Sequence, residues 1–570
     1  MTELGIHNGK LMLHCSDFHT ELARQIPGMS HDRGLSAWIA PLSTLTVNVV
    51  SDVFRGDVAY TDAVVQYMKE QITLAVQIRA AKDGTYSDGL PADISQNLWP
   101  LQKDGVAFLA SAKEAYLCDE MGSGKTIQVV RALDMVQDPF PALVVANKSA
   151  LRSVWEQEIE MWSTTGITTS VVDGTAVQRR KALRTKADVY IVGWDALRHH
   201  SRLDSYGNVS RTDKEKESKE LNDIPFKTVV VDEAHKAKEW KAKRTRALWA
   251  VAHAPSVTRR WALTGTPVTG YEQDVWGIGH TVQPAMYPRK TQWLDRYVSI
   301  SRLPGRDYPI YNGFQPATYD EMIAHLDPFM LRRTKIDIIP DYQGKLPLRT
   351  VECDMGVTQK KVYKQMAEHM MAQGEDGIIA APNPITQLLR LNQFAAATPV
   401  IQDVDGEMRV VELNMPSCKV EALFELLDEL GEAQAVVFAE SRLLIDLVSL
   451  ELEKKNVSHI RITGAEDGPI RAANIATFQS GGCRLALCTY GAGAESITLN
   501  SADTVIRLQR SYNFVLDSQA PDRVDRGARS VPVQTIDVVS GGTAEFDVHT
   551  RIGVKQELFE QVVRDRMRTV

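Results

Sequence analysis

The sequence predicts an α/β protein with two parallel-sheet domains, a helical insertion that includes the linker between them, and a small N-terminal α+β region. Two observations carry this prediction. Short apolar runs alternate with helical stretches in two separate blocks, which is typical of parallel sheets covered by helices. The chain of 570 residues is also too long for one hydrophobic core. The expected regions are residues 1–95, 96–270, 271–416 and 417–570.

Residues 1–95 are expected to form a small accessory region, which is a candidate DNA-binding module. Turn-forming residues surround Trp38 and Pro41 in "IPGMSHDRGLSAWIAPLS", and this pattern predicts short strands joined by turns. The stretch "DAVVQYMKEQITLAVQIRAAKDG" predicts a helix that ends near Gly84.

The first block of alternation contains four apolar runs that resemble buried parallel strands. These runs cover residues 142–146, 188–192, 228–233 and 259–266. Between two of them lies the charged segment "RTDKEKESKE". Its charges nearly cancel, so we expect a solvated loop there.

Residues 271–416 interrupt this alternation with Pro/Gly-rich loops and with helical pieces such as "DEMIAHLDPFMLRR" and "NPITQLLRLNQFAAA". Alternation returns in residues 417–570. There the helices "KVEALFELLDEL", "SRLLIDLVSLELEKK" and "PIRAANIATFQ" are each followed by a strand, namely "QAVVFA", "SHIRIT" and "RLALCT". This block predicts the second parallel-sheet domain.

The composition is that of an ordinary globular protein, with 44% hydrophobic and 24% charged residues. Neither a membrane helix nor a secretory signal is predicted, because no apolar run approaches about 18 residues and the N-terminus lacks a basic-then-apolar pattern. The six cysteines include no C-x-x-C pair, which argues against a zinc ribbon or disulfide framework and favours a reducing cytosol. The net charge of −7 does not indicate nucleic-acid binding, although a local basic groove would suffice for it.

The stretch "CDEMGSGKT", residues 118–126, resembles a phosphate-binding loop in which Asp119 replaces the usual first glycine. Taken alone, it could also be a strand-to-helix turn that contains a lysine. "AYLC" predicts a strand before it and "TIQVVRALDMV" a helix after it, whose N-terminal amides favour phosphate. Lys125 would reach the β- and γ-phosphates, and Thr126 would ligate Mg²⁺. The expected ATP-binding residues of this loop are Asp119, Glu120, Met121, Gly122, Ser123, Gly124, Lys125 and Thr126.

A second acidic motif follows the predicted strand "TVVVDE", which ends in Asp232–Glu233. Two adjacent carboxylates are costly at a strand end unless a cation lies beside them. We expect Asp232 to hold Mg²⁺, and Glu233 to orient and deprotonate the attacking water. The competing interpretation is a charged helix cap.

Together with further motifs, this series resembles helicase superfamily two, and within it the Swi/Snf-like translocases of double-stranded DNA. The resemblance covers residues 96–570 and implies two RecA-like domains. "LWPLQKDGVAFL" resembles the adenine-recognition motif, with Gln102 as the reader, and "PFMLRRTK" resembles the family's linker. "WALTGTPVTG" resembles the motif that couples hydrolysis to movement. The coupling residues implied by the resemblance are His235, Thr264, Gly265 and Thr266.

The second block contains "AVVFAESRLLIDLV", "TYGAGAESITLNSADTVI" and "QAPDRVDRGARS" in the family's order. Phosphoryl transfer spreads negative charge over the γ-phosphate, and an arginine from a facing surface can neutralise it. Arg523 and Arg526 are three residues apart, so on a helix they would share one face and could serve as these catalytic arginines. A surface helix with an Asp522–Arg526 pair is the alternative.

Some positions depart from the family pattern. Gly527 comes one place early before Ala528–Arg529, Ala494 and Ser496 stand where glycines are common, and "NKS" replaces a proline-containing turn. "HIRITG", the tail "GGTAEFDVHTRIGVKQELFEQVV" and the N-terminal "IPGMSHDRGLSAWIAPL" resemble the annealing-helicase branch.

A motor that moves along any DNA sequence should contact phosphates and not base edges. The resemblance implies such contacts from Lys148, Ser149 and Thr489. The basic segment "KAKEWKAKRTR" is a further candidate, with a solvated charged helix as an equal alternative. Its candidate residues are Lys236, Lys243, Arg244 and Arg246.

These observations predict an enzyme, a DNA-dependent ATPase that uses ATP and Mg²⁺. It would act on duplex or forked DNA, to remodel protein–DNA complexes or to re-anneal or branch-migrate DNA in repair or recombination. Two alternatives stay open: a strand-separating DEAH-type DNA or RNA helicase, and a non-catalytic ATP-gated DNA-binding module. We expect a cytoplasmic protein of a bacterium or a phage-infected cell, with nucleic acid as its non-sequence-specific partner, no membrane association, and a monomer as the simplest oligomeric state.

Overall fold

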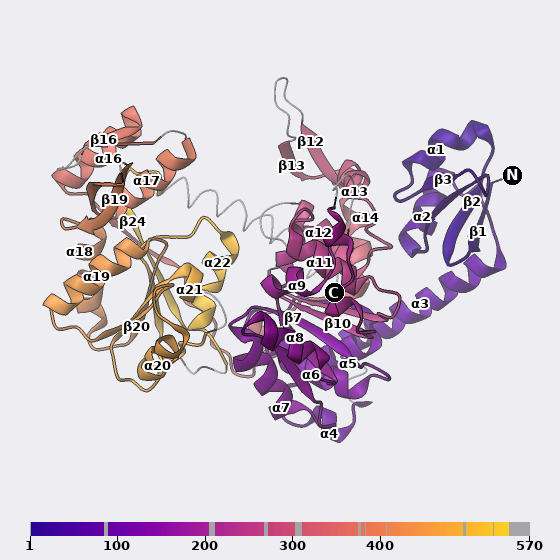
Figure 1. Cartoon of the computed structure of the whole chain (residues 1–570), viewed down its shortest axis with the longest axis horizontal. Coiled ribbons are helices and arrows are strands. Elements are labelled where there is room, and N and C mark those ends of the chain that lie inside the picture. The colour runs from indigo at the N-terminus through magenta and orange to yellow at the C-terminus, as the bar shows by residue number, and fades with distance from the viewer. Residues whose placement is uncertain are drawn as a thin grey trace. The chain divides into compact units, whose positions relative to one another are not determined.

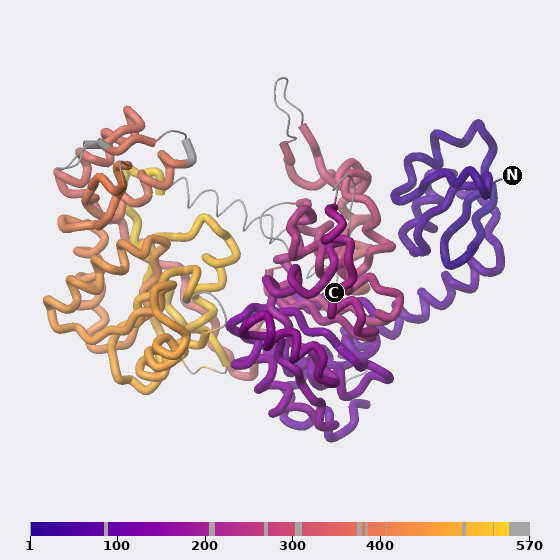
Figure 2. The backbone as a smooth tube through the Cα atoms, in the orientation of Figure 1, coloured from indigo at the N-terminus to yellow at the C-terminus, as the bar shows by residue number. Residues whose placement is uncertain are grey.

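The computed structural model of the chain divides into two compact units at the Ile338–Ile339 junction (Figures 1 and 2). Each unit is built around its own parallel sheet. The structure describes residues 2–84, 89–204, 211–266, 272–301, 310–373, 378–381, 384–405, 407–493, 497–527, 529 and 531–545.

The first unit begins with an N-terminal module, a five-stranded sheet in the order β3-β4-β2-β1-β5. Leu4, Leu11 and Leu13 are buried beneath it, and Trp38 packs edge-to-face on His31 with ring centroids 5.3 Å apart. The predicted short strands and the predicted helix ending near Gly84 are confirmed. The elements are β1 (Glu3–His7), β2 (Lys10–His14), α1 (Thr20–Gln25), β3 (Ser30–Asp32), β4 (Ala37–Pro41), α2 (Thr44–Val53), β5 (Ala59–Tyr60) and α3 (Asp62–Lys82).

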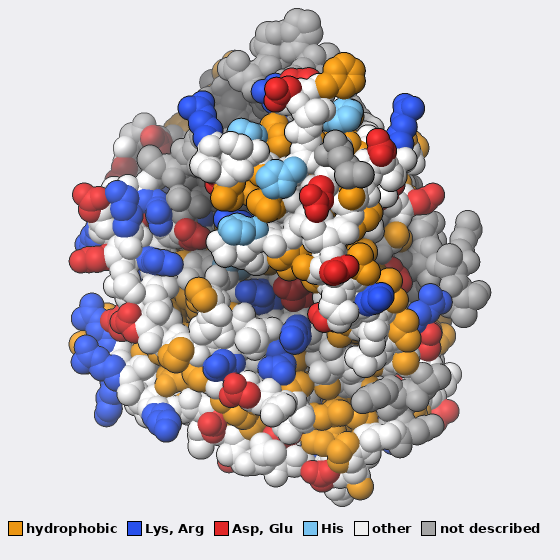
Figure 3. Space-filling view, turned by 90° about the vertical axis from the view of Figure 1, so that its right-hand side faces the viewer, with side chains coloured by type: hydrophobic (Ala, Val, Ile, Leu, Met, Phe, Trp, Pro, Cys, Tyr) orange, Lys and Arg blue, Asp and Glu red, His pale blue; other side chains and the backbone are white. Residues whose placement is uncertain are grey.

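The surface of this module carries charges of both signs. Residues 1–60 contain four Lys/Arg and six Asp/Glu. Figure 3, which views the molecule from the side of the module, shows acidic and basic side chains interspersed, with several histidines among them. A continuous basic stripe is therefore not visible on this face, and a DNA-binding role of the module stays a prediction.

The main sheet of the first unit has seven parallel strands in the order β14-β6-β11-β10-β7-β9-β8. Alternate residues of one strand lie in two different apolar cores: Val229 and Val231 pack on one side of β10, and Val230 packs on the other. Burial on both faces explains why these strands read as continuous apolar runs. The predicted strands are confirmed as β6 (Glu114–Leu117), β7 (Ala142–Ala146), β9 (Val189–Gly193), β10 (Thr228–Asp232) and β11 (Arg259–Leu263), and β8 (Thr169–Val172) completes the sheet with β14 (Met330–Leu331).

Helices cover both sides of this sheet (Figure 1). The charged segment 211–220, predicted as a loop, includes the short helix α10 (Asp213–Lys216). Its first turn is held by a Thr212–Glu215 capping box and by an ion pair of 3.2 Å between Glu215 and Lys243, so local side-chain bonds favour helical turns here. The other helices are α4 (Ala92–Ser95), α5 (Pro100–Ser111), α6 (Lys125–Met135), α7 (Gln157–Trp162), α8 (Ala176–Arg184), α9 (Trp194–His200) and α11 (Lys243–Ala252).

Residues 272–338 complete the first unit and belong to the predicted insertion. The helix predicted over "DEMIAHLDPFMLRR" is wrong in its second half, because helix α14 ends at Leu326. Strand β14 follows and pairs with β6, so the ladder takes backbone groups that a helix would have used. Since the contact division falls at Ile338–Ile339, the predicted boundaries at 270/271 and 416/417 remain a proposal. The elements are α12 (Gln273–Val282), α13 (Lys290–Tyr297), β12 (Val298–Ser301), β13 (Ile310–Phe314) and α14 (Pro316–Leu326).

The second unit has six parallel strands in the order β15-β24-β23-β20-β22-β21, which confirms the second predicted sheet. Here too, Val436 and Val437 of β20 lie in different cores. The strands are β15 (Arg349–Cys353), β20 (Ala435–Ala439), β21 (His459–Ile462), β22 (Leu485–Thr489), β23 (Thr504–Arg507) and β24 (Gln534–Ser540), with the hairpins β16 (Met371–Gln373)–β17 (Ile378–Ala380) and β18 (Thr398–Val404)–β19 (Glu407–Asn414). The helices are α16 (Val357–His369), α17 (Pro384–Ala396), α18 (Cys418–Leu430), α19 (Arg442–Lys454), α20 (Gly468–Gln479), α21 (Tyr490–Gly493) and α22 (Phe514–Gln519).

Across the described part of the chain, no helix has both the length and the apolar character needed to cross a membrane.

Candidate nucleotide-binding site

The loop of residues 118–126 connects strand β6 to helix α6, as predicted. Gly122 and Gly124 have left-handed backbones, with φ of +81° and +80°, and Gly124 caps the helix that Lys125 begins. The Lys125 ammonium donates to the carbonyl oxygens of Asp119 (2.8 Å) and Glu120 (3.1 Å). Burial lowers the pKa of Lys125, and the nearby Glu233 and Asp119 carboxylates act against that shift. The loop thus holds a half-buried cation at a helix N-terminus, which suits a polyphosphate.

Asp119, which replaces the usual glycine, is completely buried and faces an arginine from a distant part of the chain. Arg333 donates to both of its carboxylate oxygens, from Nε at 3.1 Å and from the guanidinium NH2 at 2.6 Å. The backbone N–H of Arg333 adds a third bond at 3.1 Å. A bidentate, charge-assisted pair of this kind fixes geometry strongly. Asp119 therefore fastens the loop to the segment that follows β14, which gives it a structural role beside the predicted nucleotide contact.

Gly105, in the middle of helix α5, makes room for this arrangement. A Cβ atom at this position would lie 1.7 Å from Oε1 of Gln128 and 2.7 Å from NH2 of Arg333. Gln128 in turn accepts a bond of 3.0 Å from Arg333. A Cβ atom at residue 105 would therefore force the side chains of Gln128 and Arg333 to move from these positions.

We expect Gly105→Ala to lower the free energy of unfolding by about 1–3 kcal/mol, since overpacking of a buried site forces neighbours to move. Thermal or urea unfolding measures this loss. Gly468→Ala is the matched control, because its added Cβ at the start of helix α20 would meet no atom within 4 Å. Equal stability of the two variants would contradict the close packing described here.

Asp232 and Glu233 lie at the carboxyl end of β10, two strands from β6. Asp232 accepts bonds from the Trp155 indole at 3.0 Å and from the Glu233 backbone N–H at 2.9 Å. Trp155 reaches it from the π-helical turn η3 (Leu151–Glu156), an irregular turn of the kind often found at functional sites. Glu233 has a left-handed backbone with φ of +50°, which is rare for a residue with a side chain, and its side chain forms no capping bond to the 3₁₀ turn that it precedes.

Burial and the neighbouring Glu233 charge raise the pKa of Asp232 to about 6. The folded chain then holds this proton more tightly than the unfolded chain, so the contribution of Asp232 to stability is present at low pH and is lost as pH rises from about 4 to about 6. Binding of Mg²⁺ requires the ionised form, which has the opposite dependence on pH.

Accordingly, the Mg²⁺-dependent part of ATP affinity should be about fourfold weaker at pH 5.5 than at pH 7.5, because only about a quarter of Asp232 is ionised at the lower pH. A fluorescent ATP analogue titrated with Mg²⁺ at both pH values measures the change. Asp232→Asn cannot titrate and serves as the control. If the ATP affinity of Asp232→Asn falls by the same factor between the two pH values, a group other than Asp232 causes the pH dependence.

Two of the predicted coupling residues, His235 and Thr264, lie beside the acidic pair, and Thr264 follows the neighbouring strand β11. His235 Nδ1 lies 3.3 Å from Thr264 Oγ1 and 3.3 Å from Glu233 Oε2. Gly265, which follows β11, lies so close to the phosphate loop that a Cβ there would be 2.7 Å from Met121 Cγ. The imidazole thus connects the predicted catalytic carboxylate to the end of β11, and β11 contacts the loop.

Gln102 also contacts the loop. Its amide nitrogen donates to the Ser123 carbonyl at 3.0 Å, while its amide oxygen accepts from the Trp99 backbone N–H at 3.0 Å. The side chain is buried and bonded at both ends, so it supports the loop. Its role as an adenine reader stays a prediction.

The residues present fit ATP and Mg²⁺. The buried hydroxyls of Ser123 and Thr266 have no hydrogen-bond partner in the described structure, and such atoms normally have one. Within the described residues, no group of three or more His, Cys, Asp or Glu could hold a metal by itself. Thr126 and Asp232 would therefore hold Mg²⁺ together with phosphate oxygens and water, which is how this ion is usually bound.

The predicted arginines lie in the second unit, but not on one helical face. Helix α22 ends at Gln519, Arg523 closes the 3₁₀ turn η7 (Pro521–Arg523), and Arg526 lies beyond that turn. The prediction of a shared helix is wrong because Pro521 starts a separate turn and the Arg523 carbonyl accepts a bond from the Leu499 N–H at 2.8 Å instead of continuing a helix. Arg523 donates to Gln519 at 3.4 Å, and Arg526 donates to the Thr498 hydroxyl at 2.9 Å.

Two protein-family models match the chain. The model described as SNF2-related domain matches residues 101–397, just over half of the 570 residues, and the model described as helicase conserved C-terminal domain matches residues 418–528. The chain belongs to the SNF2-related family. It is thus a Swi/Snf-like member of helicase superfamily two, as the motifs predicted.

Curated relatives of this SNF2-related chain are distant and longer. The SWI/SNF-related matrix-associated actin-dependent regulator of chromatin subfamily A-like protein 1 of Xenopus tropicalis is 27% identical over 456 residues, covering 79% of this chain and 43% of the relative. An uncharacterized ATP-dependent helicase of Mycoplasma genitalium is 24% identical, covering 86% of this chain and 44% of the relative. The chain therefore spans less than half the length of these relatives. The SWI2/SNF2 ATPase core of Sulfolobus solfataricus in complex with dsDNA is 21% identical and covers 83% of this chain and 94% of its own, but its TM-score of 0.37 is too low to support an argument.

The candidate DNA contacts of this SNF2-related chain are placed unequally. Lys148 and Ser149 are exposed just after β7, and Thr489 ends β22 half-buried. In the basic segment 236–246, Arg246 is buried, which contradicts a phosphate contact by this residue, and Lys236 donates to Asn147 at 2.5 Å. The departures at positions 494, 496 and 528, and most of the annealing-helicase-like tail, lie outside the described residues.

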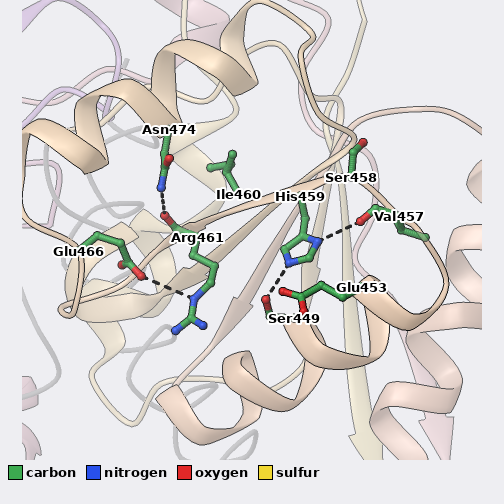
Figure 4. Close-up of a pocket in the computed structure, with 9 residues that line it drawn as sticks. All are labelled: Ser449, Glu453, Val457, Ser458, His459, Ile460, Arg461, Glu466 and Asn474. Carbon is green, nitrogen blue, oxygen red and sulfur yellow. Dashed lines mark hydrogen bonds and ion pairs between the residues drawn. The ribbon is translucent and has the colours of Figure 1, made fainter.

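A surface hollow of about 530 Å³ lies along the edge strand β21 of the second unit (Figure 4). Its polar side chains bond among themselves: His459 lies 2.7 Å from the Ser449 hydroxyl and 2.9 Å from the Val457 carbonyl. It contains none of the predicted site residues, and therefore we do not place the nucleotide there.

Sequence reasoning missed the residues that support the site from a distance: Gly105, Gln128, Trp155 and Arg333. A glycine inside a predicted helix was the one available signal, because glycine at such a position is unfavourable unless packing requires it. Arg333 lies 214 residues from Asp119 in the chain, and nothing in the local pattern connects the two.

Proposed function

We propose that this SNF2-related chain is an ATP-dependent translocase of duplex DNA, and that ATP hydrolysis at residues 118–126 drives its movement. The observation that best supports this proposal is the arrangement at one edge of the first sheet. There Lys125 follows strand β6, the Asp232–Glu233 pair lies at the end of β10, and Thr264 follows β11. The names of the relatives, which include regulators of chromatin and ATP-dependent helicases, support the same proposal.

In this proposal Lys125 binds the β- and γ-phosphates, and it gives up its bonds to the Asp119 and Glu120 carbonyls to do so. Glu233 accepts a proton from the attacking water. His235 lies between Glu233 and Thr264, so it transmits a change in the protonation of the Glu233 carboxylate to the end of strand β11. Thr126 and Asp232 would hold Mg²⁺, which would supply positive charge beside the phosphate oxygens.

The DNA contacts in this proposal are made with phosphates. Lys148 and Ser149 are exposed at the same edge of the sheet as the nucleotide loop, after a strand that neighbours β10. Contacts of this kind carry no sequence information, so binding should be non-sequence-specific and should weaken steeply with salt.

The test is steady-state ATP hydrolysis with no DNA, single-stranded DNA, linear duplex and a forked duplex, combined with displacement of a third strand from a triplex. The proposal expects stimulation by duplex and ATP-dependent displacement of the third strand. Stimulation by forks above plain duplex would favour the annealing branch. Robust separation of a tailed duplex would favour the strand-separating helicase instead, and an absence of stimulation by any DNA, with ATP binding intact, would overturn the translocase.

A further inference from the structure

The segment that joins the two units is bonded at its first end to the nucleotide loop. This linker segment, residues 333–345, starts with Arg333, whose guanidinium is bonded to Asp119 as described above. Its backbone continues the contact: the Glu120 N–H donates to the Arg333 carbonyl at 2.9 Å, and the Lys335 N–H donates to the Glu120 carboxylate at 3.0 Å. Two successive residues of the loop are thus held by the start of the linker segment.

The other end of the linker segment is bonded to the turn that carries the predicted arginines. The Lys345 ammonium lies 2.6 Å from the Asp522 carboxylate and 3.7 Å from that of Asp525. The Tyr342 hydroxyl donates to Asp525 at 2.5 Å. Asp522 and Asp525 each immediately precede one of the two arginines, so these three contacts fall on neighbours of Arg523 and Arg526.

The contact extends to Arg526 itself. Its Nε donates to the backbone carbonyl of Asp522 at 3.3 Å, while the carboxylate of the same residue binds Lys345. The Asp522–Arg526 surface pair considered above is therefore replaced by a path from Lys345 through Asp522 to Arg526. Both carboxylates are nearly inaccessible to water, with side-chain exposures of 9% and 1%, so loss of a cationic or hydroxyl partner there is costly.

We propose that Tyr342 and Lys345 are positioning residues for Arg523 and Arg526, and that the linker segment couples the nucleotide loop to those arginines. Only eleven residues lie between Arg333 and Lys345, so a short connection transmits a shift of the loop on binding or losing phosphate. The inference rests on the proposed function, because it assigns the connection between hydrolysis and the second unit.

The test compares four variants of the full chain: Lys345→Met, Lys345→Arg, Tyr342→Phe and the control Arg349→Met. Arg349 lies four residues further on and forms an exposed ion pair of 2.7 Å with Glu429, away from the arginine turn. Each variant is measured for thermal unfolding, for affinity toward a fluorescent ATP analogue, and for kcat and KM of ATP hydrolysis at saturating duplex DNA.

We expect Lys345→Met and Tyr342→Phe to lower the DNA-stimulated kcat about ten- to hundredfold, because small displacements of a catalytic group have effects of this size. ATP affinity should stay within about twofold of wild type, since Lys125 and the loop are unchanged. Lys345→Arg should restore most of the kcat, and Arg349→Met should match wild type.

Wild-type kcat in both Lys345→Met and Tyr342→Phe would overturn the inference. So would a loss in Lys345→Met that Lys345→Arg shares to the same extent. If Lys345→Met does not fold, Tyr342→Phe decides alone, since it removes a single hydroxyl. A wild-type chain that does not respond to DNA would instead contradict the proposed function, so the two failures are distinguishable.

Discussion

Glu233→Gln is expected to lower ATP turnover by about 10²- to 10⁴-fold and to leave ATP binding within about twofold of wild type, which is the range that general-base catalysis contributes. Glutamine preserves the size of the side chain and can adopt the same left-handed backbone, so the change removes only the capacity to accept a proton. Lys125 and the glycines of the loop remain in place. The measurement is single-turnover hydrolysis with pre-bound ATP, beside equilibrium binding.

Glu239→Gln is the matched control for this experiment. Glu239 lies six residues further along the same segment, and its carboxylate accepts a bond from the Lys241 N–H at 3.0 Å. Turnover in this variant should equal wild type. Lys125→Ala, in contrast, should lose both binding and hydrolysis, because its half-buried ammonium is the cation proposed to bind the phosphates. Wild-type hydrolysis in Glu233→Gln would show that the acidic pair is not the catalytic centre.

The parts of the fold that the sequence predicted well are those fixed by local patterns. A strand that is buried on both faces is usually a continuous apolar run. Strands β7, β9, β10 and β11 could therefore be predicted from the sequence alone. The phosphate loop is likewise local, since strand, glycines, lysine and helix are contiguous in the chain. The position of Lys125 at the start of helix α6 could thus be anticipated.

The parts that failed depend on partners far away in sequence. The helix expected to include Met330 was replaced by β14, because pairing with β6 satisfies the backbone better than another helical turn would. The bond between Asp119 and Arg333 joins residues 214 positions apart, so the local motif around Asp119 does not reveal it. The supposed helix of Arg523 and Arg526 ends at a proline, a local signal that the spacing argument overlooked.

The failed predictions at β14 and at Pro521 both concern contacts of the linker segment, residues 333–345. Strand β14 brings Arg333 to Asp119, and the turn at Pro521 presents Asp522 to Lys345. Both are contacts of the linker segment, so the sequence motifs indicate the chemistry of the site, while the long-range ion pairs indicate how its parts are held. A stability change at either contact should therefore appear in catalysis and not only in unfolding.

Arg526→Ala and Arg523→Ala are each expected to reduce DNA-stimulated ATP hydrolysis by about 10³-fold, because an arginine that neutralises the γ-phosphate in the transition state typically contributes 10³ to 10⁵. ATP affinity should change little, since neither side chain belongs to the phosphate loop. In the structure Arg526 donates to Thr498 and to the Asp522 carbonyl, and it would exchange these neutral acceptors for phosphate oxygens. Turnover with saturating duplex and binding of an ATP analogue measure the two effects.

Arg442→Ala is the control for loss of an arginine in the second unit, because that side chain is 60% exposed and, within the described residues, pairs with Asp446 of its own helix. Its turnover should stay at the wild-type level. Arg526→Lys separates charge from shape: lysine keeps the charge but not the planar fork, so it should recover little activity if two phosphate oxygens are bound at once. Full activity in Arg526→Ala and Arg523→Ala alike would mean that the γ-phosphate is neutralised entirely within the first unit, and hydrolysis could then proceed without any contribution from the second.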